Sequence, residues 1–413
     1  MKLHELTLVV SSPPSVERNP PKQKTSIHSR SYDRGLLRRR IKDFSILTIV
    51  VVVLTVTLIS FFKITTSPAP DFSVFYYGAK DLILKQNPYQ DPKLFTGIGY
   101  PPLTLLFFLP LAIMPYQIAQ SVWLGLSFLS LLGAVYLSLK ISLGHFSRRF
   151  FWLVLALVLF AFPTKFTFGM GQSNLVALFL LLLAFSLFKD KKSILAGLIL
   201  GLVCLIKPIL ASFLLLFFLK KAWIVVFTAF LMINFFILVS FFIFNPNLYW
   251  FYINEIIPQL LNLAGREIYY NQGIMGFISR SVLDLGLRRN LTILFSLAIT
   301  GMTFWIIKGK GEGKNKFAIF FPAILLLDTL SWQHHFVWLI FPFIAIYSRL
   351  LKAKFVPLKL ILLLAYILVA INFKDPLLVG KRLHPLFLSH VFLGTIILWG
   401  LGIYFFKKDH ESI

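Results

Sequence analysis

The sequence predicts an all-α protein that crosses a membrane many times. Of its 413 residues, 58% are hydrophobic and 16% are aromatic, and only 14% are charged. Soluble domains carry about 25% charged residues. Long apolar runs recur along the chain, and most approach the roughly 20 residues that a membrane-spanning helix needs. Together these observations favour a polytopic helical bundle of about twelve transmembrane helices.

Short basic segments separate the apolar runs and set the predicted orientation. Loops rich in Lys and Arg stay on the cytoplasmic side of a membrane. The alternate loops then face outward, and both termini are cytoplasmic. The basic segments are His145 to Arg149, Lys189 to Lys192, Lys220-Lys221, Lys308 to Lys316, Arg349 to Lys354 and Lys407-Lys408.

The net charge of +25 does not indicate a nucleic-acid-binding protein. Its cations concentrate in the N-terminal tail and in the short inner loops, where they set the orientation of the chain in the membrane and attract anionic lipid. The chain has a single cysteine, Cys204, which excludes a disulfide within the chain. The outer loops must therefore be ordered by packing.

The polar tail of residues 1–43 is predicted to be a disordered basic cytoplasmic segment. The first apolar run begins too late and is too long for a cleaved signal peptide, so we expect a retained helix over 44–62. The transmembrane domain then extends over 44–406, and 407–413 form a second cytoplasmic tail. We recognise no internal repeat in this domain.

The first outer loop carries Asp71 and then FSVFYYGAKDLILKQNPY, in which apolar residues recur at helical spacing. We predict an amphipathic helix over 72–86 at the membrane interface, with Asp71 at its N-cap. The next apolar stretch, 102–115, is short for a crossing and lies between prolines. We interpret it as re-entrant or interfacial, with 117–139 as the second crossing, since a full span would place Arg148-Arg149 outside.

Ten more crossings follow the second one. Lys207-Pro208 divides the stretch 193–219, which we interpret as two short helices; a single helix is the alternative, but it would place Lys220-Lys221 outside. Residues 245–290 form a second large outer loop. The predicted crossings are 151–168, 173–188, 193–206, 208–219, 222–244, 291–307, 317–330, 333–349, 357–374 and 387–406.

Unusual polar residues collect on the predicted outer side. They include Arg266 and Asp328, and three further charged residues that have candidate roles. Asp71 is placed to act as a general base on a sugar hydroxyl, or is an ordinary N-cap. Lys207 interrupts an apolar stretch, where an ammonium needs an anionic partner such as a lipid phosphate, unless it snorkels to the interface. Arg280 either binds a phosphate through two N–H groups of its guanidinium or is a solvated loop charge.

Neutral polar residues complete the outward set. Gln172 and Asn174 follow a glycine turn, and their amides suit sugar hydroxyls or simply cap the next helix. His334 and His335 are adjacent and point apart, so hydrogen bonding to phosphate or sugar is favoured over metal ligation, with an interfacial role as the alternative. The chain has no nucleotide-binding or HExxH motif. We therefore expect a lipid-linked substrate and no cofactor. The sequence shows no convincing set of metal ligands, and it does not decide whether the reaction needs a metal.

These segments together resemble glycosyltransferase family 87, a bacterial branch of the GT-C superfamily. The resemblance covers roughly residues 44–405, and each motif is short. The matching segments are Asp71 with Tyr76-Tyr77 and Ala79, Asn87-Pro88-Tyr89, Tyr100-Pro101-Pro102 with Pro110, Gly171-Gln172-x-Asn174, Ala196-Gly197 leading to Lys207-Pro208, Asn271-Gln272-x-x-x-Gly276 with Arg280, and Ser331-Trp332-x-His334-His335.

The resemblance implies a GT-C-type fold in the bacterial inner membrane with an outward-facing active site. It implies an inverting transferase that moves mannose or another pentose or hexose from a polyprenyl-phosphate donor to a glycolipid or glycan acceptor. Asp71 then corresponds to the acidic base of the first outer loop. The remaining roles are donor phosphate binding by Lys207, Arg280, His334 and His335, and sugar or acceptor binding by Tyr89, Gln172, Asn174 and Gln272.

The alternative is a transporter or flippase of a lipid-linked sugar. Transporters commonly show inverted repeats and polar sites near the middle of the membrane. This sequence shows no such repeat, and its polar residues lie near one face. The transferase is therefore the favoured interpretation, while the sugar, the acceptor and the linkage do not follow from the sequence.

Overall fold

The computed structural model describes residues 67–90, 99–261, 266–309, 313–352, 356–373 and 383–411, with a few isolated positions between 48 and 59. Residues 50–413 form one compact unit, which is described below. The predicted tail over 1–43 and most of the helix predicted over 44–62 lie outside the described residues.

The described chain is helical, with one isolated β-bridge between Asn271 and Trp332. Most of the apolar runs of the sequence become helices at the predicted places. The helices are α2 (Pro70–Ile83), η1 (Pro88–Gln90), α3 (Pro102–Leu105), η2 (Leu106–Phe108), α4 (Leu109–Ala112), α5 (Tyr116–Leu143), α6 (Arg148–Phe160), α7 (Phe162–Met170), α8 (Asn174–Lys189), α9 (Ser193–Ile206), η3 (Pro208–Ala211), α10 (Ser212–Leu219), α11 (Trp223–Ile243), α12 (Asn247–Phe251), η4 (Tyr252–Ile256), α13 (Ile257–Leu261), α14 (Ile274–Ser281), α15 (Leu285–Lys308), α16 (Gly313–Leu327), η5 (Gln333–Leu339), α17 (Ile340–Lys352), α18 (Val356–Ala370), α19 (Pro385–Leu388) and α20 (His390–Glu411).

Five segments of the described chain are long and apolar enough to cross a membrane, and the bent pair α6–α7 makes a sixth if it is one span. The axes of α6 and α7 differ by 67°. The protein is thus a helical membrane protein, while about twelve crossings stays a prediction. The five segments are Tyr116–Leu143, Trp223–Ile243, Leu285–Lys308, Gln333–Leu351 and His390–Lys407.

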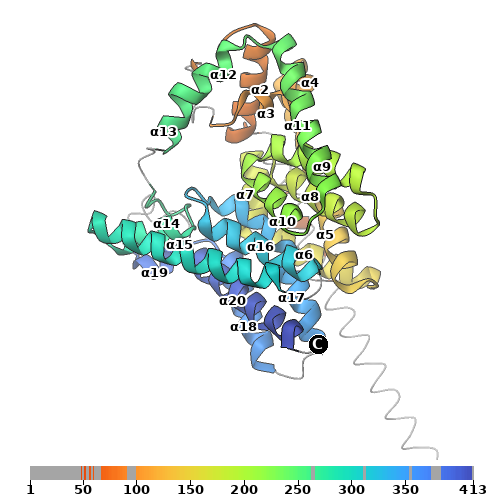
Figure 1. Cartoon of the computed structure of the whole chain (residues 1–413), viewed down its shortest axis with the longest axis vertical. Helices are drawn as coiled ribbons and strands as arrows, with labels where there is room; N and C mark the ends of the chain where they lie inside the picture. The colour runs from red at the N-terminus through yellow and green to blue at the C-terminus, as the bar shows by residue number, and fades with distance from the viewer. Residues whose placement is uncertain are drawn as a thin grey trace, which may run out of the picture. The chain divides into compact units, whose positions relative to one another are not determined.

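Helices α9 and α11 pack closely along their length (Figure 1). Gly197 and Gly201 lie one turn apart on α9 and allow the backbones to approach. A Cβ at Gly197 would lie 1.8 Å from Thr228 Oγ1, and one at Gly201 would lie 2.7 Å from Met232 Cβ. Small residues at this spacing are typical of membrane helix contacts, where close van der Waals packing supplies the attraction.

Two predicted features of the helix breaks are present. Helix α9 ends before Lys207, and η3 begins at Pro208, because proline has no N–H to continue the helical hydrogen bonds of α9. The stretch at 102–115 forms only the short segment α3–η2–α4. Whether that segment is re-entrant stays a prediction.

Two predicted boundaries are wrong. Helix α15 begins at Leu285 instead of 291, because the Asp284 carboxylate caps it by accepting a hydrogen bond from Leu287 N at 2.6 Å. Helix α20 continues to Glu411, through the start of the predicted C-terminal tail at 407. Helices α12 and α13 fill part of the large predicted outer loop.

Candidate active site

The first turn of α2 presents Asp71 beside the core of the helical bundle. Gln120 of α5 fixes the start of α2: its side chain accepts a hydrogen bond from Ala69 N and donates one to Ser67 O, each 2.9 Å long. Phe72 is fully buried and stacks on Trp123. These contacts leave Asp71 partly exposed at a fixed position.

Asp71 is not the N-cap of α2, so that prediction is wrong. Ala69 occupies the N-cap position, and no side chain caps the helix. Pro70 starts the helix and has no N–H that needs a cap. The Asp71 carboxylate is instead directed to another part of the chain.

Gln172 joins Asp71 to Lys207 through the two ends of its amide. Its Nε2 donates to Asp71 Oδ2 at 2.6 Å, and its Oε1 accepts from Lys207 Nζ at 3.1 Å. Gly171, at φ +68°, makes the left-handed turn between α7 and α8 that places Gln172 here. A carboxylate and an ammonium are therefore held on opposite sides of one neutral side chain.

Tyr100 completes the surroundings of Lys207. The ammonium donates to Tyr100 OH at 2.5 Å and lies 5.0 Å from the centre of that ring. Lys207 itself is only 2% exposed. Both groups that accept hydrogen bonds from this buried ammonium are neutral, so the site is suited to an added anion.

A second wall of the site comes from the chain around η5. His335 Nδ1 lies 3.9 Å from Asp328 Oδ2 and has no hydrogen-bond partner. The His334 carbonyl accepts hydrogen bonds from Thr167 Oγ1 and Asn174 Nδ2, each 3.0 Å long. Asn174 Nδ2 also lies 2.9 Å from His334 Nδ1.

Burial changes the acidity of both carboxylates. It raises the pKa of Asp71 above its usual value, against the opposing effects of the Gln172 hydrogen bond and the Lys207 charge. It also raises the pKa of Asp328 to about 6. The positive charge of Lys207 acts on both carboxylates, which places all three groups in one electrostatic environment.

The structure therefore brings together six of the predicted site residues: Asp71, Gln172, Asn174, Lys207, His334 and His335. It adds Tyr100 and Asp328, to which the sequence analysis gave no role. The Tyr-Pro-Pro start of α3 was a usable signal for Tyr100, since the prolines fix the chain that follows it. Among the described residues, no three His, Cys, Asp or Glu side chains group as a metal site.

Arg280 is not placed as predicted, because its guanidinium binds carbonyl oxygens of its own loop and the hydroxyl of Ser389. Nη1 donates to Ile268 O and Asn271 O, each at 2.8 Å, and Nη2 and Nε donate to Ser389 Oγ at 2.9 and 3.1 Å. Asn271 in turn forms the β-bridge to Trp332, just before His334. Arg280 therefore supports the wall of the site from behind.

Gln272 also differs from its predicted role, while sugar or acceptor binding by Tyr89 stays a prediction. Gln272 is fully buried: its Nε2 donates to Tyr269 O and Leu388 O, and its Oε1 accepts from Phe392 N. Its amide has no free group for a sugar. Tyr89 OH donates to Tyr100 O at 2.8 Å, which places Tyr89 beside the site and uses its hydroxyl proton.

The sequence model of glycosyltransferase family 87 matches residues 98–327. The chain belongs to this family. The matched stretch contains Tyr100, Gln172 and Lys207 of the cluster, while Asp71 precedes it and His335 follows it. In this family 87 chain, segments inside and outside the matched stretch thus meet at one place.

Two curated relatives are similar to this chain over part of its length. One is the polyprenol-phosphate-mannose-dependent alpha-(1-2)-phosphatidylinositol pentamannoside mannosyltransferase of Mycolicibacterium smegmatis, 27% identical over 258 residues, which are 61% of each chain. The protein of the same name from Mycobacterium tuberculosis is 26% identical over 268 residues, 61% of this chain and 58% of that one. The family 87 chain thus spans about three fifths of the length of these relatives. No solved structure matches it.

Proposed function

We propose that the protein is an integral membrane glycosyltransferase. It moves a sugar from a polyprenyl-phosphate donor to a hydroxyl of a glycolipid or glycan acceptor, at the outer face of the bacterial inner membrane and with inversion. Mannose is the proposed sugar, because the names of both curated relatives specify polyprenol-phosphate-mannose. A phosphatidylinositol mannoside is the acceptor class that the same names support.

Asp71 is the general base of the proposed reaction. Its carboxylate takes the proton of the acceptor hydroxyl while that oxygen attacks the anomeric carbon. The bond from this carbon to the phosphate oxygen breaks, and the electron pair leaves with the polyprenyl phosphate. A single displacement of this kind inverts the anomeric centre.

Lys207 neutralises the leaving phosphate in this proposal. Fixed positive charge near a departing anion lowers the barrier, because the site need not reorganise as the charge develops. His335 adds a hydrogen-bonding nitrogen on the opposite wall, and Asp328 lies 3.9 Å from that ring. Lys207 thus supplies the neutralising charge, and the proposed reaction uses no cofactor.

The observation that carries the proposal is the shared amide of Gln172. It holds a carboxylate at one end and an ammonium at the other. Inverting transfer needs these two functions on opposite sides of one anomeric carbon. Burial keeps the pKa of Asp71 above its usual value, which makes the carboxylate a stronger base than an exposed one.

The test compares Asp71→Asn with the wild-type chain, reconstituted in liposomes with polyprenyl-phosphate mannose and a phosphatidylinositol mannoside. Loss of a general base lowers kcat by about 10²–10⁴-fold, while the donor KM stays near its wild-type value. The control is Asp190→Asn, an exposed carboxylate between α8 and α9, which retains full activity. Near-full turnover by Asp71→Asn would remove Asp71 from the reaction.

Lys207→Met tests the phosphate role in the same assay. Methionine keeps most of the length of the side chain and removes its charge, so kcat falls and the donor KM rises while the acceptor KM is kept. An unchanged donor KM and kcat contradict phosphate binding by Lys207. The melting temperature of each variant shows whether the fold is retained.

A further inference from the structure

A basic pocket lies at the corner where α5 ends and α6 begins, and its volume is about 640 Å³. We call it the corner pocket. Gly144, at φ +76°, ends α5 and allows the chain to turn there. Three basic side chains line the pocket: Lys140 from the last turn of α5, His145 from the corner and Arg148 from the first turn of α6. The turn therefore brings basic groups from two helices to one place.

The described lining of the corner pocket contains no acidic residue. In the described chain, no carboxylate pairs with Lys140, His145 or Arg148. Lysine and arginine bind phosphate through charge-assisted hydrogen bonds, and imidazole has a donor nitrogen in either protonation state. The three side chains can therefore bind an added phosphate together.

Aromatic side chains make the apolar part of the corner pocket. Tyr136 and Phe146 meet edge to face with ring centres 5.8 Å apart, and Phe151 and Trp152 meet in the same way at 5.3 Å. Tyrosine and tryptophan are enriched where a membrane meets water, because each has an apolar body and a polar end. This lining is suited to the boundary between the headgroups and the acyl chains of a bilayer.

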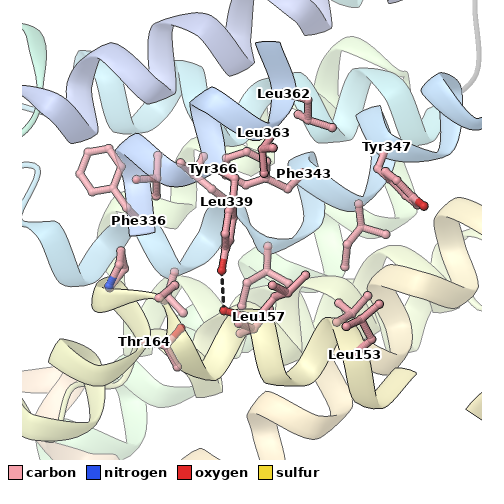
Figure 2. A pocket seen from close by; sticks show the side chains of 18 of the residues that line it. Leu153, Leu157, Thr164, Phe336, Leu339, Phe343, Tyr347, Leu362, Leu363 and Tyr366 are labelled. Carbon is pink, nitrogen blue, oxygen red and sulfur yellow. Dashed lines mark hydrogen bonds between the residues drawn. The ribbon is translucent and has the colours of Figure 1, made fainter. Parts of the chain in front are cut away.

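Helix α6 has different residues on its two sides. Leu153 and Leu157 line an apolar groove that α6 forms with α17 and α18 (Figure 2), whereas Arg148 and Trp152 line the corner pocket. The described lining of the apolar groove contains one charged residue, Lys359. Of these two hollows, the corner pocket is therefore the one that is suited to an anion.

One face of α5 is exposed and apolar, and it leads to the corner pocket. Its side chains are 46–64% exposed and recur at helical spacing: Ile118, Val122, Leu126, Leu129 and Tyr136. Lys140 follows Tyr136 by about one turn, so both lie on this face, and both line the pocket. Leu129 lies about 16 Å along α5 from Lys140, close to half of the bilayer core of about 30 Å. An acyl chain on this face thus spans one leaflet when its phosphate lies in the pocket.

The corner pocket and the candidate active site lie at opposite ends of α5. Tyr116, the first residue of α5, donates from its OH to Ala69 O at 3.4 Å, two residues before Asp71. Lys140 lies 24 residues further along the helix, which is about 36 Å. Because α5 is long and apolar enough to cross a membrane, the two sites face opposite membrane surfaces. A lipid in the pocket is therefore neither the proposed donor nor the proposed acceptor.

We infer that the corner pocket binds the phosphate of an anionic membrane phospholipid, whose acyl chain lies along the exposed face of α5. Basic pockets between membrane helices hold such lipids through charge and apolar contact together. A zwitterionic headgroup also carries an ammonium, for which the described lining offers no acid. The inference goes beyond the proposed function and does not depend on it, because no residue of the candidate active site takes part.

The test measures the apparent Kd of phosphatidylglycerol for the full chain in neutral detergent, from the rise in melting temperature as lipid is added. Lys140→Gln and Arg148→Gln each remove one exposed cation of the pocket. Lys192→Gln is the matched control, because Lys192 is an exposed cation between α8 and α9 that does not line the pocket. Phosphatidylcholine tests the need for net negative charge, and glycerol phosphate tests the need for the acyl chains.

We expect each pocket variant to raise the Kd of phosphatidylglycerol about fivefold, the usual effect of one cation beside anionic lipid. Lys192→Gln binds as wild type does, and phosphatidylcholine and glycerol phosphate bind more weakly than phosphatidylglycerol. An unchanged Kd in both pocket variants overturns the inference, and so do equal losses in all three variants, which show a general attraction to basic residues. Glycerol phosphate that binds as tightly as the lipid identifies free phosphate as the ligand and also overturns it.

A second readout uses the wild-type chain alone. Phosphatidylglycerol with a photoreactive group in the middle of its acyl chain is crosslinked to the protein, and the site is mapped by mass spectrometry. We expect crosslinks on α5 between Leu129 and Tyr136 that excess phosphatidylglycerol removes and excess phosphatidylcholine does not. Crosslinks on other helices only, or none, overturn the inference. Neither experiment measures sugar transfer, so a failure of the proposed function leaves its outcome unchanged.

Discussion

Replacing Gln172 with methionine separates the effect of the shared amide from that of the charges it joins. The substitution keeps the side-chain length and removes the hydrogen bond from Nε2 to Asp71 Oδ2, which is 2.6 Å long. A hydrogen bond to a charged group contributes about 1.5–3 kcal/mol. Because one pKa unit corresponds to about 1.36 kcal/mol, the pKa of Asp71 rises by about one to two units.

The sign of the effect follows from the role of the carboxylate. Asp71 must be ionised to accept a proton, and burial already raises its pKa. In Gln172→Met the ionised form needs a higher pH, so activity is lost sooner as the pH falls. The acidic limb of the pH profile of kcat/KM therefore moves to higher pH by about one to two units.

The assay measures kcat/KM for the donor across the acidic and neutral range in wild type and Gln172→Met. The control is Gln259→Met, an exposed glutamine of α13 whose loss leaves the profile unchanged. Asp328 has a pKa raised to about 6, so Asp328→Asn is measured as well. If the acidic limb of the kcat/KM profile is unmoved in Gln172→Met and absent in Asp328→Asn, the limb reports the ionisation of Asp328. That result would refute the assignment to Asp71.

Two further predictions concern the support of the site. Arg280→Met removes the donors to Ile268 O, Asn271 O and Ser389 Oγ. We expect a loss of about 2–4 kcal/mol of stability, seen as a lower melting temperature, with little change in donor KM. An unchanged melting temperature with a raised donor KM would instead support phosphate binding by Arg280. Gly171→Ala places a Cβ 2.6 Å from Phe72 Cβ, at a residue whose φ is +68°. We expect about 1–3 kcal/mol of destabilisation and a lower kcat, because α2 is displaced. A variant with wild-type stability and rate would contradict that close contact.

The helices could be predicted because their signals are local. Apolar runs bounded by charged or proline residues place α5, α8, α9 and α11 within a few residues of the structure. The start of α15 was missed by six residues. Its first turns carry Arg288 and Arg289, which read as loop residues, while the cap at Asp284 sets the boundary.

The candidate site could be predicted only as a set of residue types. A lysine within an apolar stretch indicates a functional position, because burying its charge is costly wherever the chain folds. The same argument misplaced Arg280. Its charge is satisfied by carbonyl oxygens and a serine hydroxyl nine to 109 residues away, and nothing in the local sequence marks these partners.

By itself, the sequence determined that this is a helical membrane protein and where the break at Lys207-Pro208 falls, but not the bend between α6 and α7 inside the crossing predicted over 151–168. Hydropathy, charge and proline act on neighbouring residues, so their effects are already present in the chain order. Only the tertiary structure decided that Gln172 lies between Asp71 and Lys207, which are 101 and 35 residues away from it. Contacts at such separations depend on how all the helices pack together, because packing selects among many polar partners that the sequence leaves equally available.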